Sequence, residues 1–206
     1  MQRIYSTLAV FVIALLLLAG CQPVTREGGA AQAEAAATES AATAVAGMMG
    51  QGGMMHGNSD APFDALFLDG MIMHHQGAIV MASQAISESE HAEVRQLAEA
   101  IVSAQGPEIA QMQSWRSEWY PDLPPTMGMN MNMGMMQIAA DSATPFDRRF
   151  LEAMINHHQG AIQMSTTALQ QAEHQEVRDL AEKIIDAQQA EIEQMRAWLS
   201  EWYGVK

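Results

Sequence analysis

Histidine and methionine recur in this chain at spacings that would let them bind a soft metal ion. Met71, His74 and Met81 would share one face of a helix, because their separations of three and seven residues match whole helical turns. A neutral imidazole with thioether sulfurs is a donor set suited to Cu(I), whereas magnesium, calcium and manganese favour oxygen ligands. The same pattern recurs further along the chain as Met154, His157 and Met164.

A second histidine, His75 or His158, directly follows the first one in each copy of this pattern. It would lie about 100° further around the helix, on the neighbouring aliphatic seam. We expect one histidine of each pair to bind the ion while the other supports the packing. The alternative for the histidines is a hydrogen-bonded core role, and for the methionines it is plain core packing.

Polar residues on the following helical segment are placed to support these histidines. Antiparallel counting from a turn near Ser89 brings Gln105 and Glu108 within one helical turn of His74, and Gln188 and Glu191 are their repeats. These side chains are candidates for accepting an imidazole N–H, or for binding the ion directly.

Two methionine-rich segments form a further group of candidate ligands. Flexible, thioether-rich chain can surround a soft cation without a preformed site, although compositional drift would give the same pattern. The candidate accessory ligands are Met48, Met49, Met54, Met55, His56, Met127, Met129, Met131, Met133, Met135 and Met136.

The two histidine pairs belong to two copies of a tandem duplication. Residues 62–120 align without gaps on residues 145–203, at an offset of 83, and more than half of the aligned residues are identical. Each repeat shows apolar residues at alternating steps of four and three on two segments, which predicts a hairpin of two helices. We expect Asp64 and Asp147 to cap the first helix of their own repeats.

Two such hairpins predict an all-α protein, a four-helix bundle of ferritin-like topology. Its parts are a hairpin over residues 62–120, a Pro- and Met-rich linker over 121–144 that is long enough to cross the bundle, and a second hairpin over 145–206. Gly106-Pro107 in the first repeat replaces Gln189-Ala190 in the second, and a proline inside a helix kinks it.

The N-terminal residues resemble a bacterial lipoprotein signal. A charged start, an apolar run and small residues before Cys21 indicate a signal peptide over residues 1–20 and lipidation of Cys21, the chain's single cysteine. Residues 21–61 are rich in alanine, glycine and threonine, which is typical of a flexible tether. We expect an extracytoplasmic protein anchored to the cell envelope, periplasmic or on the outer surface. Its net charge of -14 argues against nucleic-acid binding.

The segment His74-His75-Gln76-Gly77-Ala78, with its repeat and the companion Gln-x-x-Glu-Ile-x-x-Met, resembles the bacterial domain-of-unknown-function family numbered 305, which includes CopM-like copper-binding proteins. The resemblance extends over residues 62–203. It implies a ferritin-like helical fold, an extracytoplasmic setting and binding of copper or silver through histidine and methionine. A copper exporter or chaperone would then be a partner.

Two other functions remain open from the residues. A structural or adaptor bundle without metal would use the histidines only as core supports. A di-iron oxidase would need paired Glu-x-x-His motifs, and Glu88-x-x-His91 fits while its repeat begins with Gln171. We see no convincing catalytic constellation and expect a protein that is not an enzyme.

Overall fold

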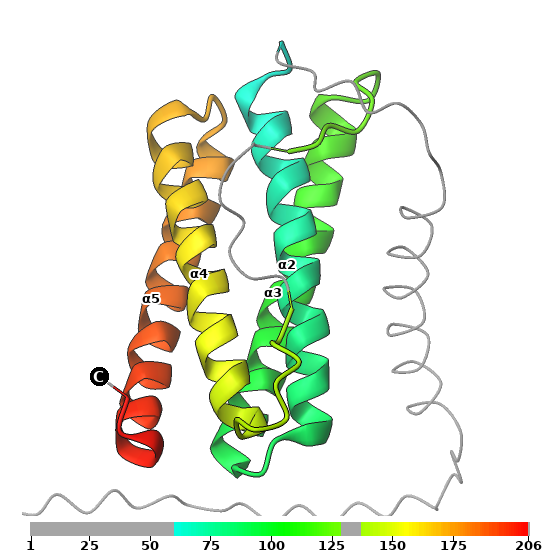
Figure 1. Cartoon of the computed structure of the whole chain (residues 1–206). Helices are drawn as coiled ribbons and strands as arrows, with labels where there is room; N and C mark the ends of the chain where they lie inside the picture. Colours follow the sequence, from blue (N-terminus) through cyan, green and yellow to red (C-terminus); the bar gives the residue numbers. More distant parts are fainter. Residues whose placement is uncertain (1–59, 129–136, 206) are drawn as a thin grey trace, which may run out of the picture. The chain divides into compact units, whose positions relative to one another are not determined.

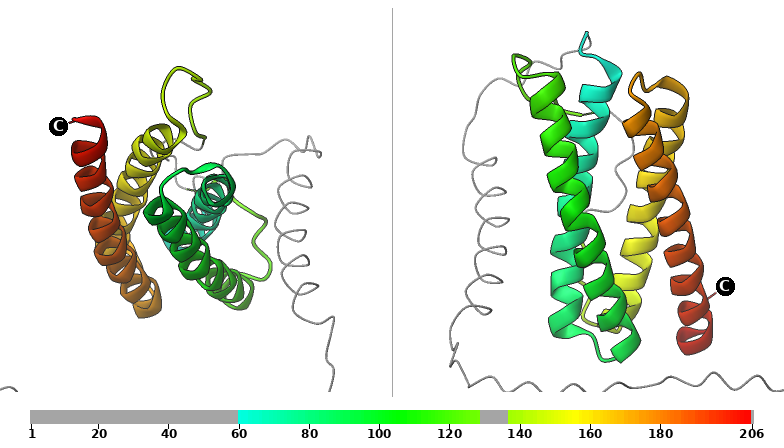
Figure 2. Two further views of the ribbon diagram at one scale, coloured as in Figure 1. Left: turned by 90° about the horizontal axis from the view of Figure 1, so that it is seen from below. Right: turned by 180° about the vertical axis from the view of Figure 1, so that it is seen from behind.

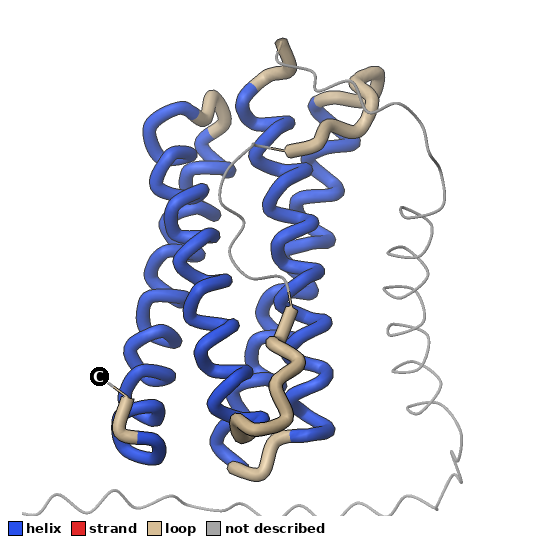
Figure 3. Tube along the Cα trace, in the orientation of Figure 1, coloured by secondary structure: helices blue, strands red, loops and turns tan. Residues whose placement is uncertain are grey.

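Four long helices make up the part of the chain that the structure describes. The computed structural model describes residues 60–128 and 137–205, and Figure 1 shows their arrangement. The helices are α2 (Phe63–Glu88), α3 (Ala92–Trp119), α4 (Phe146–Gln171) and α5 (Gln175–Tyr203). Figure 3 shows helices joined by loops, without a strand in these residues. The predicted all-α four-helix fold is confirmed.

The two hairpins pack through their first helices. α2 packs on α3, α4 packs on α5, and α2 packs on α4. α2 and α4 run antiparallel, while α3 and α4 run in the same direction (Figures 1 and 2). The connection from α3 to α4 therefore joins opposite ends of the bundle, which is the crossover predicted from the linker length.

Two apolar clusters fill the interior, one in each half of the bundle. One contains Phe67, Leu68 and Met71 of α2 with the later part of α4, and the other contains Phe150 and Leu151 of α4 with the later part of α2. Each cluster draws on all four helices. Between them along every helix lie polar residues, which include the histidine pairs on α2 and α4. A polar layer thus crosses the middle of an otherwise apolar core.

The predicted capping role of Asp64 and Asp147 is wrong. The residues at the N-caps of α2 and α4 are Pro62 and Pro145, and neither helix start has a side-chain cap. Each aspartate instead lies buried inside the first turn and binds the other repeat. The reason is tertiary: the turn of the opposite hairpin brings two backbone N–H groups to each carboxylate, and these donors need an acceptor.

At other positions, residues close in sequence explain where a helix ends. Gly204 ends α5 in the left-handed conformation, with φ of 64°, and its N–H donates to the carbonyl of Ser200. Glycine adopts this conformation without the steric cost that a side chain would add. Pro107 lies inside α3, which continues from Ala92 to Trp119 as one helix.

The linker is fixed to the first hairpin by a polar contact that the second hairpin lacks. Arg116 pairs with Asp69 at 2.9 Å, and Asp69 also accepts hydrogen bonds from the backbone N–H and hydroxyl of Thr126, both at 2.8 Å. Gly128 follows with φ of 68°, and a Cβ there would lie 2.5 Å from the Cα of Gly70. Leu199 replaces Arg116 in the second repeat, so the two halves differ at this surface.

Several predicted features lie outside the described residues. They are the signal peptide, Cys21, most of the tether, the methionine-rich segment before residue 57, and Met129 to Met136. Within the described residues, none of the helices has the length and apolar character needed to span a bilayer.

Candidate metal centre

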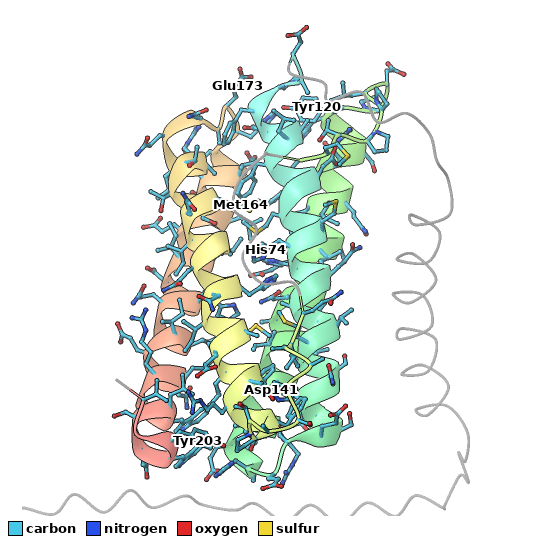
Figure 4. The ribbon with its side chains drawn as sticks, in the orientation of Figure 1. His74, Tyr120, Asp141, Met164, Glu173 and Tyr203 are labelled. Atoms are coloured by element: carbon cyan, nitrogen blue, oxygen red, sulfur yellow. The ribbon has the colours of Figure 1, made fainter. Side chains whose placement is uncertain are left out.

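The four predicted histidines come together at the middle of the bundle. His74 of α2 and His157 of α4 stack face to face, with ring centroids 3.7 Å apart and planes inclined by 22°. The Nε2–H of His157 donates to the backbone carbonyl of His74 at 2.9 Å. Figure 4 shows His74 between α2 and α4. The two repeats are related by an approximate twofold axis. A residue near that axis therefore contacts the equivalent residue of the other repeat, as His74 contacts His157.

Each second histidine extends this pair outward toward a glutamate. The ring of His75 lies 6.5 Å from that of His74, and its Nε2 is 2.9 Å from Oε2 of Glu108 on α3. His158 lies 6.5 Å from His157, and its Nε2 is 2.6 Å from Oε2 of Glu191 on α5. The result is a polar row across the bundle in the order Glu108, His75, His74, His157, His158, Glu191.

Several nitrogen and oxygen atoms in this layer are buried without a hydrogen-bond partner in the described structure. All four histidines are fully buried, and Gln105 and Gln188 are nearly so. The unpartnered atoms of the layer are both ring nitrogens of His74, Nδ1 of His75, Nδ1 of His158, and Oε1 of Gln105 and Gln188. Buried polar atoms without a partner cost about 1 to 3 kcal/mol each, so a group of them in one layer indicates a binding function.

The environment keeps His74 in its neutral form, in which a ring nitrogen has a lone pair available. Burial, followed by the neighbouring imidazoles of His157, His75 and His158, lowers the pKa of His74 to about 2. Desolvation disfavours a charged ring, and each neighbouring imidazole would repel a second positive charge. The lone pair of His74 is therefore present throughout the physiological pH range.

Fully buried methionines lie in the apolar clusters on both sides of the histidine layer. Met71 and Met164 share one cluster, and Met81 and Met154 share the other. Figure 4 shows Met164 beyond His74 in the space between α4 and α2. Sequence reasoning did not select two further buried methionines, Met112 of α3 and Met195 of α5, which join these clusters. The repeated Gln-x-x-Glu-Ile-x-x-Met segment was the signal that could have found them.

The side chains present fit a thioether site better than a carboxylate or multi-histidine site. The described residues contain no group of three or more His, Cys, Asp or Glu side chains placed to hold one ion. The buried thioethers on both sides of the histidine layer are additional soft donors that could complete a coordination shell. Glu88 and His91, the partial di-iron motif, lie at the end of α2 and in the following turn, away from the central layer.

The other predicted site residues that the structure describes include several that are more exposed to solvent. The side chains of Glu108 and Glu191 are 29% and 22% exposed, so the polar row reaches solvent at both ends. Met127 is 51% exposed beside the bundle. The remaining accessory ligands, from Met48 to His56 and from Met129 to Met136, fall outside the described residues.

Sequence reasoning also missed a pair of contacts that join the repeats at both ends of the bundle. Asp64 accepts hydrogen bonds from the backbone N–H and the ring Nδ1–H of His174, at 2.9 and 2.6 Å. The imidazole of His174 stacks on Trp119, with centroids 3.8 Å apart. At the opposite end Asp147, His91 and Trp202 make the same arrangement.

Several solved structures resemble this bundle. CopM in its Cu(I)-bound form is 36% identical, with a TM-score of 0.59, and the match covers 68% of this chain and 97% of CopM. A DUF305 fragment from Deinococcus radiodurans is 30% identical, with a TM-score of 0.57, and covers 68% and 97% of the two chains. A DUF305 protein from Streptomyces coelicolor, described as a candidate secreted protein, is 26% identical, with a TM-score of 0.59 and coverage of 68% and 92%.

Among proteins of curated function, none matches the sequence significantly. The model of the domain of unknown function DUF305 matches residues 16–116 and 120–199, which include both helical hairpins and the central histidine layer. The chain therefore belongs to the DUF305 family.

Proposed function

We propose that this protein binds a soft monovalent ion, Cu(I) or Ag(I), at the central histidine layer. The observation that carries the proposal is the set of buried imidazole nitrogens without hydrogen-bond partners in the described structure, with buried methionines in the apolar clusters on both sides. The proposed ligands come from Met71, His74, His75, Met81, Met154, His157, His158 and Met164. The protein would buffer the ion outside the cytoplasm or hand it to an exporter or chaperone.

The chemistry of the donors supports a soft ion over a hard one. Neutral nitrogen and thioether sulfur suit Cu(I), and binding adds one positive charge to a layer that holds two glutamates at its ends. The acidic chain, with a net charge of -14, attracts cations in general and adds no selectivity.

The related structures support the same conclusion. CopM has been solved with Cu(I), with Ag and with Cu(II) bound, and it is 36% identical to this chain. Its similarity covers 68% of this chain. Metal binding by a relative at this distance favours a metal-binding function for this chain over a purely structural bundle.

An anaerobic titration against a chromophoric Cu(I) chelator tests the proposal. The purified protein is expected to withdraw Cu(I) from the chelator. Replacing Met71, Met81, Met154 and Met164 together by leucine should weaken binding by at least about tenfold, equivalent to about 1.4 kcal/mol. The free energy of unfolding should change little, because methionine and leucine have similar volumes.

A variant in which leucine replaces Met129, Met131 and Met133 is the control. It should keep the high-affinity binding, because these residues are not among the proposed ligands of the histidine layer. If the wild-type protein does not compete for Cu(I), the proposed function is wrong. If only the linker variant loses affinity, the ion binds in the methionine-rich segments and not in the histidine layer.

We also propose that Cys21 carries a lipid and holds the protein to the cell envelope. The small residues before Cys21 support this, as does the description of a related protein as a candidate secreted protein. A Cys21→Ser variant expressed in a bacterium should lose labelled fatty acid and leave the membrane fraction. Unchanged fatty-acid labelling in that variant would contradict the proposal.

A further inference from the structure

We propose that Glu108 and Glu191 are positioning residues that fix the tautomers of His75 and His158, so that each ring presents its Nδ1 to an ion bound on its own side of the histidine layer. This inference rests on the proposed function and names the atoms that it uses. It assigns a ligand role to His75 and His158, the second histidine of each pair. Their position on the aliphatic seam left open whether they bind the ion or support the packing.

The carboxylate of each glutamate sets the direction of its hydrogen bond to the neighbouring imidazole. An ionised carboxylate has no proton to give, so the ring nitrogen beside it must donate. Nε2 of His75 lies 2.9 Å from Glu108 Oε2, and Nε2 of His158 lies 2.6 Å from Glu191 Oε2. In its neutral form each ring would therefore carry its proton on Nε2, which leaves the lone pair on Nδ1.

The lone pair on each Nδ1 lies in the protein interior. Nδ1 of His75 and Nδ1 of His158 are buried, and neither has a hydrogen-bond partner among the described residues. An unsatisfied buried acceptor is costly unless it serves a ligand. A carboxylate that orients a metal-binding imidazole from the opposite nitrogen is a common arrangement, and it raises the basicity of the ring.

The central pair makes a different contact. His157 donates its Nε2–H to the backbone carbonyl of His74 at 2.9 Å. The carboxylate contacts occur once in each repeat at equivalent positions. Exposure of 29% and 22% at the two glutamates shows that they are also accessible from solvent.

Long-range ¹H–¹⁵N NMR spectra of the apo protein test the tautomers without any metal. We expect His75 and His158 to show a protonated Nε2 and an unprotonated Nδ1. In Glu108→Leu the signature of His75 alone should be lost, while that of His158 stays. A protonated Nδ1 in either wild-type ring would overturn the inference.

Cu(I) competition provides the second readout. Glu108→Leu should weaken Cu(I) binding by about 10- to 100-fold, the range typical of lost support behind a metal-binding histidine. Glu108→Gln keeps a carbonyl acceptor and should recover part of the loss. Glu99→Leu, at an exposed position on the same helix, is the matched control and should bind as the wild type does.

The outcomes separate this inference from the proposed function. If the wild-type protein fails to bind Cu(I), the proposed function fails, even where the NMR tautomers agree. If the wild type binds Cu(I) but Glu108→Leu and Glu191→Leu, both folded by circular dichroism, bind equally well, the positioning role is wrong and the proposed function stands.

Discussion

A His74→Leu variant is expected to be more stable than the wild-type apo protein and to bind Cu(I) at least about tenfold more weakly. His74 is fully buried, and both of its ring nitrogens lack a hydrogen-bond partner in the described structure. Leucine has a similar volume and needs no partner, so the free energy of unfolding should rise by about 1 to 2 kcal/mol. Urea denaturation of the metal-free proteins measures the first effect, and chelator competition measures the second.

His75→Leu is the comparison that makes this prediction specific. His75 is equally buried, but its Nε2 has a carboxylate partner, and the substitution removes that hydrogen bond. Its apo stability should fall or stay unchanged. If His74→Leu instead lowers the free energy of unfolding by more than about 1 kcal/mol, the ring nitrogens of His74 already have hydrogen-bond partners in the apo protein. That result would remove the main reason for placing an ion there.

Removing the carboxylate of Asp64 should destabilise the protein by about 3 kcal/mol. This side chain is fully buried and accepts three hydrogen bonds, from the backbone N–H groups of Glu173 and His174 and from the ring of His174. Asp64→Ala leaves these donors without an acceptor at a junction between the two repeats. The midpoint of urea denaturation should therefore fall, with far-ultraviolet circular dichroism as the probe.

Asp147→Ala should give a loss of similar size, because Asp147 binds Glu90 and His91 in the same way. The double variant should lose about the sum of the two, since the sites lie at opposite ends of the bundle, as Figure 4 shows for their neighbours Tyr120 and Tyr203. Asp186→Ala, at an exposed position on α5, should change stability by less than about 0.5 kcal/mol. A loss in Asp64→Ala no larger than in this control would contradict the structural role.

The sequence predicted the elements well because helix formation and duplication are visible locally. The alternating four and three spacing of apolar residues predicted two helices in each repeat, and the identity of the repeats predicted two equal hairpins. The placement of His74 and His157 on buried faces follows from the same periodicity, which fixes the angle of a side chain around its own helix.

The partners of these side chains could not be predicted in the same way. Glu108 was expected within one helical turn of His74, and in the structure it contacts the neighbouring His75. Counting residues from the turn predicts the height of Glu108 along the bundle axis. It does not predict how α3 is rotated about its own axis relative to α2. Asp64 was expected to cap its own helix, but the turn of the opposite hairpin offers it donors that no local pattern reveals.

The sequence by itself therefore determined the helices, the twofold repetition and the types of donor atom available, because these depend on residue order within about two helical turns. Tertiary structure decided the contacts of the polar layer. It stacked His74 on His157, paired each second histidine with a glutamate, and set buried methionines on both sides. The reason is that these contacts form between helices, where packing against the other repeat fixes which side chains meet.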